Sequence, residues 1–377
     1  MSAPPQAQGP RRVDAAALDR FCRAVLAAAG ADAGTVDAAT RAMLHGSRLG
    51  VDSHGVRLLG HYVAVLQGGR VNPRPAMTWP ADGGAVAVLD ADNGHGALAT
   101  FHAVDHAVGR ARTTGLAAVA IRNSSHFGPA GAYALAAAEA GMIGLVTCNA
   151  DSYVRLHGGA ERFHGTNPLA CAVPVAGGRP WLLDMATSAI PYNRIQLYKS
   201  LGRDLPPGTA SAAGGIDTVD PAAAQMLAPL GGDFGFKGAG LAGLSEILSA
   251  VLTGMRLSFE IAPMAGPDLA SPRGLGAFVL VLRPQAFLPE EDFDAGMRRY
   301  LAALRRSAAR PGEEVLAPGD REWAEADRRA AAGIPIDPDT EAVFRDLVDR
   351  FGLAPPAFAA APDAASAPPG ASGAKTG

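Results

Sequence analysis

Residues 85–147 read AVAVLDADNGHGALATFHAVDHAVGRARTTGLAAVAIRNSSHFGPAGAYALAAAEAGMIGLVT. In this stretch, short apolar runs of strand length alternate with longer segments whose apolar residues recur at helical spacing. The expected elements are strands at 85–89, 116–121 and 143–147 and helices at 97–113 and 129–140. Strands that alternate with helices are typical of α/β proteins, so the stretch predicts a partly parallel sheet covered by helices.

The segments on either side of this stretch extend the prediction. Further strands are expected at 169–175, 180–183 and 276–282, and helices at 14–29, 37–49, 57–67, 238–252, 290–306, 318–332 and 338–350. We therefore predict a helical N-terminal segment (13–75), an α/β region (76–285) and a helical C-terminal segment (286–353) that packs on the N-terminal one. Residues 1–12 and 354–377 are rich in Pro, Gly, Ala and Ser and are expected to be disordered tails.

The composition limits the partners of the chain. Its 377 residues are 48% hydrophobic, and 33 basic and 36 acidic side chains leave a net charge of −3, which gives no electrostatic reason to expect nucleic acid or an anionic membrane. Three widely spaced cysteines, Cys22, Cys148 and Cys171, argue against a disulfide framework and for a reducing compartment. The longest apolar segment, 239–255, is too short to span a bilayer, and no signal-peptide pattern begins the chain. The sequence therefore predicts a cytoplasmic protein.

Two Ser-His pairs suggest an enzyme. The first lies in Asp52-Ser53-His54-Gly55-Val56-Arg57 and the second in Asn123-Ser124-Ser125-His126-Phe127-Gly128. An imidazole that titrates near neutrality can move a proton, and a nearby arginine can hold a carboxylate. His126 also follows a buried strand, and ligands of α/β sheets gather where strands end. A surface or capping histidine is the alternative for each motif taken alone.

Two other histidine patterns have plainer interpretations. Gly94-His95-Gly96-Ala97-Leu98-Ala99 fits the dinucleotide fingerprint G-x-G-x-x-A, but the acid expected at the end of the next strand is missing, so we interpret it as a tight turn. His102 and His106 have the i, i+4 spacing of two zinc ligands, yet no third ligand is evident. We interpret them as a solvated helical face and predict no metal site.

Three polar turns follow or precede the predicted strands and helices. The glycine-rich run 231–238 contains Lys237 and leads into the helix expected from 239, an arrangement that favours a phosphate or pyrophosphate over a bare flexible loop. The turns Gly165-Thr166-Asn167-Pro168 and Asp184-Met185-Ala186-Thr187-Ser188 leave the predicted sheet. Each of the latter two, taken alone, could be an Asx-turn or a helix cap.

The order of these motifs resembles the type 2 malate/L-lactate dehydrogenase family over residues 14–350. The series ends with a Lys-Gly pair that opens an apolar helix and with Arg310-Pro311-Gly312-Glu313. The family also includes ureidoglycolate, sulfolactate and diketogulonate oxidoreductases and a cyclic-imine reductase. The resemblance implies a non-Rossmann nicotinamide-binding α/β fold with a mixed sheet and a helical domain built from N- and C-terminal segments, assembled as a homodimer.

The resemblance also implies roles for individual residues. His54 would be the acid/base at the substrate oxygen, with Ser53 and Arg57 close to the substrate, and His126 matches the proton acceptor of the ureidoglycolate-type members. Thr166 and Asn167 are assigned to the substrate. The cofactor, NAD or NADP, would contact Asp184, Met185, Ala186, Thr187, Ser188, Phe236, Lys237, Pro311, Gly312 and Glu313.

Two departures from the family pattern bear on the substrate. Arg194 stands where the imine-reducing members carry an aspartate, and a cation there fits a keto or hydroxy acid better than an iminium ion. Ala150 replaces a serine near the cofactor. We therefore expect an oxidoreductase that interconverts a small 2-hydroxy acid and its 2-oxo acid. The alternatives are an NADPH-dependent reductase of cyclic imino acids on the same scaffold and a non-catalytic binding protein.

Overall fold

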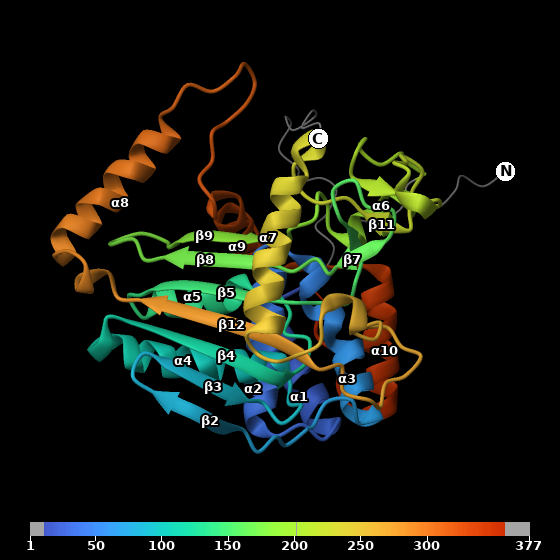
Figure 1. Ribbon diagram of the computed structural model, residues 1–377. Helices are drawn as coiled ribbons and strands as arrows, with labels where there is room; N and C mark the ends of the chain where they lie inside the picture. Colours follow the sequence, from blue (N-terminus) through green and yellow to red (C-terminus); the bar gives the residue numbers. More distant parts are fainter. Residues whose placement is uncertain (1–10, 201, 359–377) are drawn as a thin grey trace.

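The computed structural model describes residues 11–200 and 202–358, and a seven-stranded sheet forms its centre (Figure 1). The strand order across the sheet is β2-β3-β4-β12-β5-β8-β9. The strands span Thr78–Gly83 (β2), Val86–Asp90 (β3), Leu116–Ser124 (β4), Ile143–Cys148 (β5), Leu169–Val173 (β8), Trp181–Met185 (β9) and Leu275–Leu282 (β12).

The sheet is mixed, as the sequence predicts. β3 and β4 are parallel, whereas every other neighbouring pair in this sheet is antiparallel. β12 lies between β4 and β5, so that Val279 is opposite Val119 on one side and Val146 on the other. Because β12 is covered on both faces, its sequence is an almost unbroken apolar run.

Alanine-rich helices cover one face of the sheet. They are α4 (Gly96–Thr114) and α5 (Gly131–Glu139), and α2 (Ala33–Arg48) packs on the outside of α4. Ala103 and Ala107 of α4 and Ala134 of α5 have no exposed surface. Small side chains at these positions let the helix axes approach the strands closely, so that packing here depends on many short contacts.

A second layer joins the two ends of the described chain. It contains α1 (Ala15–Ala28), α3 (Leu59–Gly68) and α10 (Pro338–Phe351), and β1 (Arg11–Val13) pairs antiparallel with β13 (Ile334–Ile336). The rings of Phe21 and Phe344 lie 4.9 Å apart between α1 and α10. The N- and C-terminal segments thus share one apolar core, as the predicted fold class requires.

A small four-stranded sheet was not expected from the sequence. Its order is β10-β11-β6-β7, with strands Ala210–Ser211 (β10), Met226–Leu227 (β11), Val154–Arg155 (β6) and Arg162–His164 (β7). Ile195 of α6 (Tyr192–Ser200) is buried against it together with Val154 and Leu227. Strands of two or three residues are too short to produce an alternating pattern.

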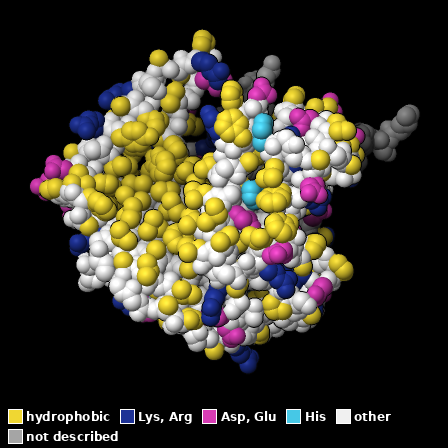
Figure 2. Space-filling model, viewed as in Figure 1, with side chains coloured by type: hydrophobic (Ala, Val, Ile, Leu, Met, Phe, Trp, Pro, Cys, Tyr) yellow, Lys and Arg dark blue, Asp and Glu magenta, His cyan; other side chains and the backbone are white. Residues whose placement is uncertain are grey.

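The second face of the large sheet is only partly covered. α7 (Phe236–Glu246) crosses it and continues as a π-helical turn over Ile247–Val251, where the sequence predicts a single α-helix at 238–252. α8 (Glu290–Arg305) stands away from the body of the molecule (Figure 1), and α9 (Asp320–Ala332) returns toward α2. Hydrophobic side chains gather on the surface between α7 and α8 (Figure 2).

The predicted tails lie mostly outside the described residues. Where the two predicted tails join the folded chain, the structure is ordered and not disordered as expected. Arg11 and Arg12 belong to β1, and Phe358 forms a β-bridge with Val13. The Arg11 guanidinium lies 3.8 Å from the centre of the Phe358 ring, so this contact holds both ends on the helical layer. No helix within 11–200 and 202–358 has the length and apolarity needed to cross a membrane.

Candidate active site

The two Ser-His motifs meet in space. His54 ends a 3₁₀ turn at Asp52–His54 in the N-terminal layer, and His126 follows β4 of the sheet. Their ring centres are 6.0 Å apart and their planes are inclined by 23°. The structure therefore brings together the two histidines that the sequence singles out, from separate elements.

A hydrogen bond fixes one nitrogen of each ring. The Tyr62 hydroxyl, on α3, lies 3.1 Å from Nδ1 of His126, and the Ser53 hydroxyl lies 2.8 Å from Nδ1 of His54. Tyr62 is fully buried, and burial raises the pKa of its hydroxyl far above the usual range, so the hydroxyl stays protonated. When Tyr62 donates to Nδ1, the proton of the neutral His126 ring is on Nε2.

Burial keeps both imidazoles neutral. It lowers the pKa of His54, and it lowers that of His126 further because His54, His61 and Arg273 are also close. A neutral imidazole can accept the proton of a substrate hydroxyl, and its protonated nitrogen can donate to a carbonyl oxygen.

Two further histidines, which sequence reasoning missed as site residues, complete the cluster. The His61 ring lies 6.4 Å from that of His126, edge to face, and the His95 ring packs 4.3 Å from Tyr62. Nδ1 of His95 accepts a hydrogen bond from Ala97 N at the start of α4. His61 follows no recognisable motif, whereas His95 lies inside Gly94–Ala99, the run interpreted as a tight turn.

The glycines of that run serve close packing. Ser125 Oγ accepts a hydrogen bond from Gly96 N and donates one to Gly94 O, at 2.9 and 3.0 Å. A Cβ atom on Gly96 would lie 2.2 Å from the Ser125 carbonyl oxygen. The run therefore ties the start of α4 to the second Ser-His motif. The other pair, His102 and His106, lies against Trp79, and His106 Nε2 is 3.1 Å from Asp82.

A small cavity adjoins the cluster. Its lining is His61, Tyr62, Val65, Arg70, Val71, His95, Ser125, His126 and Arg273. Arg70 and Arg273 are almost fully buried. Cationic side chains in a small polar cavity favour an anionic ligand.

Arg57 is not brought to this cavity. Val56 and Leu58 on either side of it are buried, which turns Arg57 outward. Its guanidinium is half exposed and lies 3.6 Å from Asp337 and 3.8 Å from Asp339, at the start of α10. The arginine assigned to the substrate by the motif thus faces the C-terminal segment in this chain.

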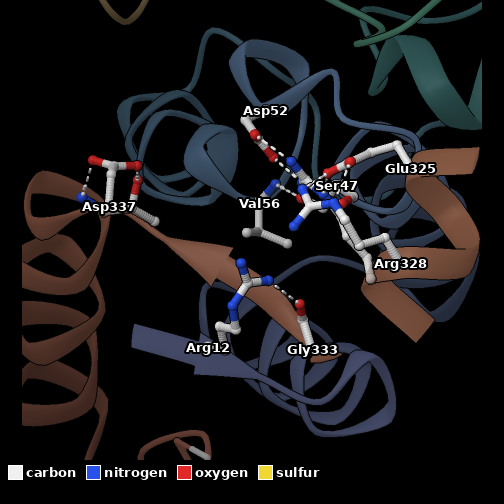
Figure 3. A network of polar contacts seen from close by, with 10 residues as sticks. Arg12, Ser47, Asp52, Val56, Glu325, Arg328, Gly333 and Asp337 are labelled. Atoms are coloured by element: carbon white, nitrogen blue, oxygen red, sulfur yellow. Dashed lines mark hydrogen bonds and ion pairs between the residues drawn. The ribbon is translucent and has the colours of Figure 1, made fainter. Parts of the chain in front are cut away.

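A buried arginine holds the His54 turn in place. Arg329 of α9 donates to Ser47 O at 2.7 Å and to both carboxylate oxygens of Asp52, and it also pairs with Glu325 (Figure 3). Val56 N donates to the Ser47 hydroxyl at 2.9 Å. A Cβ atom on Gly55 would lie 2.2 Å from that hydroxyl oxygen, so only glycine fits between the two segments.

Asn167 is buried in the protein, and Thr166 beside it is half-buried. Asn167 has no exposed surface; its amide nitrogen donates to Glu246 at 2.6 Å, and its amide oxygen accepts from Ala150 N. Thr187 donates to Thr166 O at 3.0 Å. These contacts join the turn to the 184–188 segment and leave the Asn167 side chain no free face for a substrate.

Two of the three segments assigned to the cofactor are neighbours. Leu230 N donates to Thr187 O at 2.9 Å, and Ser188 forms a bridge with Pro229, so 184–188 runs beside the glycine-rich turn that leads into α7. Lys237 is in the first turn of α7, with its ammonium 5.3 Å from the centre of the exposed Phe234 ring. A cation at a helix start beside glycines fits a phosphate group.

Asp184 faces the start of α5. One of its carboxylate oxygens accepts a hydrogen bond from Gly131 N at 2.9 Å. Burial outweighs this hydrogen bond and raises the pKa of the carboxyl to about 6. Asp184 is thus a structural link between β9 and α5 as well as a member of the predicted cofactor turn.

The third cofactor segment lies apart. Pro311, Gly312 and Glu313 are exposed in the loop between α8 and α9, where Glu313 N donates to Arg310 O. Within the described parts of the chain, no hydrogen bond or ion pair connects this loop to the histidine cluster. Figure 1 places the same loop beyond the edge of the large sheet.

The comparisons with known proteins agree with the fold. The family model described as malate/L-lactate dehydrogenase matches residues 13–344. The chain is similar to a malate dehydrogenase of Pyrococcus abyssi, with 35% identity over 76% of this chain and 80% of the relative. It is also similar to a Delta(1)-pyrroline-2-carboxylate/Delta(1)-piperideine-2-carboxylate reductase of Pseudomonas syringae pv. tomato, with 33% identity over 77% of this chain and 82% of the relative.

A solved structure shows the same fold. The malate dehydrogenase of Pyrococcus horikoshii OT3 superposes with a TM-score of 0.83 and 29% identity, covering 91% of this chain and 96% of that chain. The family model covers most of the described residues and includes both Ser-His motifs. On this evidence the chain is an oxidoreductase that belongs to the malate/L-lactate dehydrogenase family.

Proposed function

We propose that the protein is an NAD(P)-dependent oxidoreductase that interconverts a small 2-hydroxy acid and its 2-oxo acid. The observation that carries the proposal is the placement of the half-buried, neutral His54 and His126 rings with their centres 6.0 Å apart, beside a cavity lined by two arginines. Proton transfer and carboxylate binding are the two tasks that this chemistry requires of the protein.

His126 and His54 divide the proton transfer in this mechanism. When Nδ1 of His126 carries the ring proton and donates it to the Tyr62 oxygen, Nε2 is free to take the proton from the substrate hydroxyl during oxidation and to return it to the carbonyl oxygen during reduction. The Ser53 hydroxyl donates to Nδ1 of His54, so that Nε2 of His54 carries the ring proton and stabilises the developing charge on that oxygen. A bound nicotinamide supplies or accepts the hydride at the substrate carbon.

The residues around Lys237 fit such a cofactor. The lysine and the glycine-rich turn offer a cation and backbone N–H groups to the pyrophosphate, beside the 184–188 segment. Phe234 and Phe236 are more than half exposed next to them, which leaves aromatic surface for a planar ring. We assign these segments to the cofactor and Pro311–Glu313 to a contact completed by a second subunit.

The second subunit is proposed from the uncovered face of the sheet. Ile247 and Val251, in the π-helical turn that follows α7, and the adjoining Leu252 are each more than half exposed. Figure 2 shows hydrophobic side chains gathered on the surface between α7 and α8. An apolar surface of this continuity is typical of an interface between subunits. A homodimer would cover it. Three free cysteines support a reducing, cytoplasmic location.

The test is a substrate panel with matched variants. Pyruvate, oxaloacetate and a cyclic imino acid are each assayed with NADH and NADPH by loss of absorbance at the nicotinamide band. We expect turnover of a 2-oxo acid; turnover of the imino acid alone would favour the reductase activity of the Pseudomonas relative. We further expect His126→Ala and His54→Ala each to lower kcat by about 10²- to 10⁴-fold while cofactor binding survives.

The control variant is His102→Ala, because this histidine is exposed and lies against Trp79, away from the cluster. It should keep wild-type kcat. Wild-type kcat in the His126 and His54 variants would remove both imidazoles from the mechanism. Failure of the wild-type protein to bind either nicotinamide cofactor in a fluorescence titration would instead contradict the enzyme assignment.

A further inference from the structure

The carboxylate of the substrate needs a cation, and the cavity offers two that the sequence motif does not include. Arg57 is turned toward Asp337 and Asp339. Arg70 and Arg273, in contrast, line the cavity beside His61 and His126 and are 3% and 4% exposed. The hydrogen bonds of these two arginines determine which of them is free to bind a ligand.

Arg70 is committed to the backbone. Its two terminal nitrogens donate to the carbonyl oxygens of Met264 and Asp268. It therefore holds the loop between Ser258–Glu260 and β12 against the end of α3. Only its Nε remains without a partner, and that atom is buried.

Arg273 is held on one side only. Its Nε donates to Ala262 O at 2.8 Å, and its Nη2 pairs with a carboxylate oxygen of Asp151. The other oxygen of Asp151 accepts from Met264 N, so the carboxylate is itself fixed. Within the described residues, Nη1 of Arg273 makes no hydrogen bond. The guanidinium plane is thus oriented while one of its nitrogens is left for a ligand.

The charges around the cavity point to an anion. The nine lining residues include two guanidinium groups and no carboxylate. Asp151 is the carboxylate that pairs with Arg273. The side chain of Asp268 accepts hydrogen bonds from Ala270 N and Ser271 N, and it is the backbone carbonyl of Asp268 that accepts from Arg70. Nε2 of His95 is also buried without a partner, and His95 is part of the lining. Unpartnered buried donors and a surplus of positive charge are both satisfied by a bound anion.

We propose that Arg273 is the residue that binds the carboxylate of the substrate, in place of Arg57. This assignment rests on the proposed function and names the substrate as a small carboxylate whose acid group enters the cavity next to His126. The reacting carbon, adjacent to that carboxylate, would then lie between the cavity and the two imidazoles.

The experiment compares Arg273→Gln with Arg57→Gln, using the 2-oxo acid that the wild-type protein reduces fastest. A charge-assisted hydrogen bond lost from a buried site corresponds to about a 10- to 150-fold rise in KM. We expect a rise of that size in Arg273→Gln with an unchanged dissociation constant for the cofactor. Guanidinium chloride at millimolar concentration should lower the KM of Arg273→Ala again, which a merely structural arginine would not explain. Arg57→Gln should keep the wild-type KM.

The pH profile gives an independent readout. The positive charge of Arg273 contributes to the low pKa of both His61 and His126. Removing it should raise both pKa values and so move the acid limb of the kcat/KM profile to higher pH when the reaction is followed in the direction of 2-hydroxy acid oxidation, where His126 must be neutral. If Arg273→Gln does not fold, Arg273→Lys is used instead. It keeps the positive charge but lacks the planar guanidinium that can donate two parallel hydrogen bonds to a carboxylate, so its KM should still rise.

The outcomes distinguish a failure of the Arg273 assignment from a failure of the proposed function. A wild-type KM in a folded Arg273 variant, or a rise in KM in Arg57→Gln instead, overturns the assignment of Arg273 and leaves the proposed function standing. A wild-type protein that reduces no 2-oxo acid overturns the proposed function itself.

Discussion

Replacing Arg329 by Met removes the guanidinium that joins the His54 turn to α9. Arg329 is 6% exposed and donates to Ser47 O, Asp52 and Glu325. Each charge-assisted hydrogen bond contributes about 1.5–3 kcal/mol. Water can replace the arginine at Asp52, whose side chain is half exposed, but not at Ser47 O, which is buried. We therefore expect a loss of about 3 kcal/mol in the free energy of unfolding, at the low end for a broken buried ion pair.

The assay is urea denaturation followed by tryptophan fluorescence, because Trp323 lies on the same helix as Arg329. The same variant should lower kcat, since Asp52 begins the turn that ends at His54. The control is Arg328→Met. Arg328 is the next residue and also pairs with Glu325, but it is more than half exposed, so its loss should change the free energy by no more than about 0.5 kcal/mol. Equal unfolding midpoints for the two variants would refute the reasoning.

Two other predictions concern the sheet. In Asp184→Asn, a carboxyl whose pKa burial raises to about 6 is replaced by a neutral amide that can still accept from Gly131 N. The pKa of an aspartate is about 4 in the unfolded chain. Asp184 therefore lowers the free energy of unfolding of the wild-type protein as the pH rises from about 4 through 6, and the variant should lack this loss. A difference in free energy of unfolding between the two proteins that stays constant from pH 4 to pH 7 would contradict this prediction. Ile247→Glu should convert a dimer to monomers in analytical ultracentrifugation, whereas Ile216→Glu, at another exposed apolar side chain, should not; an unchanged mass in both would exclude this face as the interface.

The alternation of strands and helices could be predicted from the sequence because each element is long enough to show its period. The expected helix at 97–113 is α4 at Gly96–Thr114, and the expected strand at 276–282 is β12. The strand order could not be predicted in the same way. β12 enters between β4 and β5 through pairings with residues more than a hundred positions away, and no local pattern records such a partner.

Only part of the candidate site, too, could be predicted from the sequence. Residues in recognisable motifs, His54 and His126, could be found from the sequence, and the structure places them together. The direction of the Arg57 side chain could not be predicted, because spacing along the chain does not show which way a side chain points between two buried neighbours. His61, Tyr62 and Arg273 belong to no motif, so only the folded chain shows that they line one cavity.

The contact between Arg329 and Asp52 links residues separated by 277 positions. During synthesis on the ribosome, His54 leaves the exit tunnel long before α9 exists, and its turn lacks that support until the last quarter of the described chain has emerged. The α/β sheet can form earlier, because β12 ends at Leu282. Incomplete chains would thus carry a formed sheet with an unsupported His54 turn, and under the proposed mechanism activity would appear only in molecules whose C-terminal helices are in place.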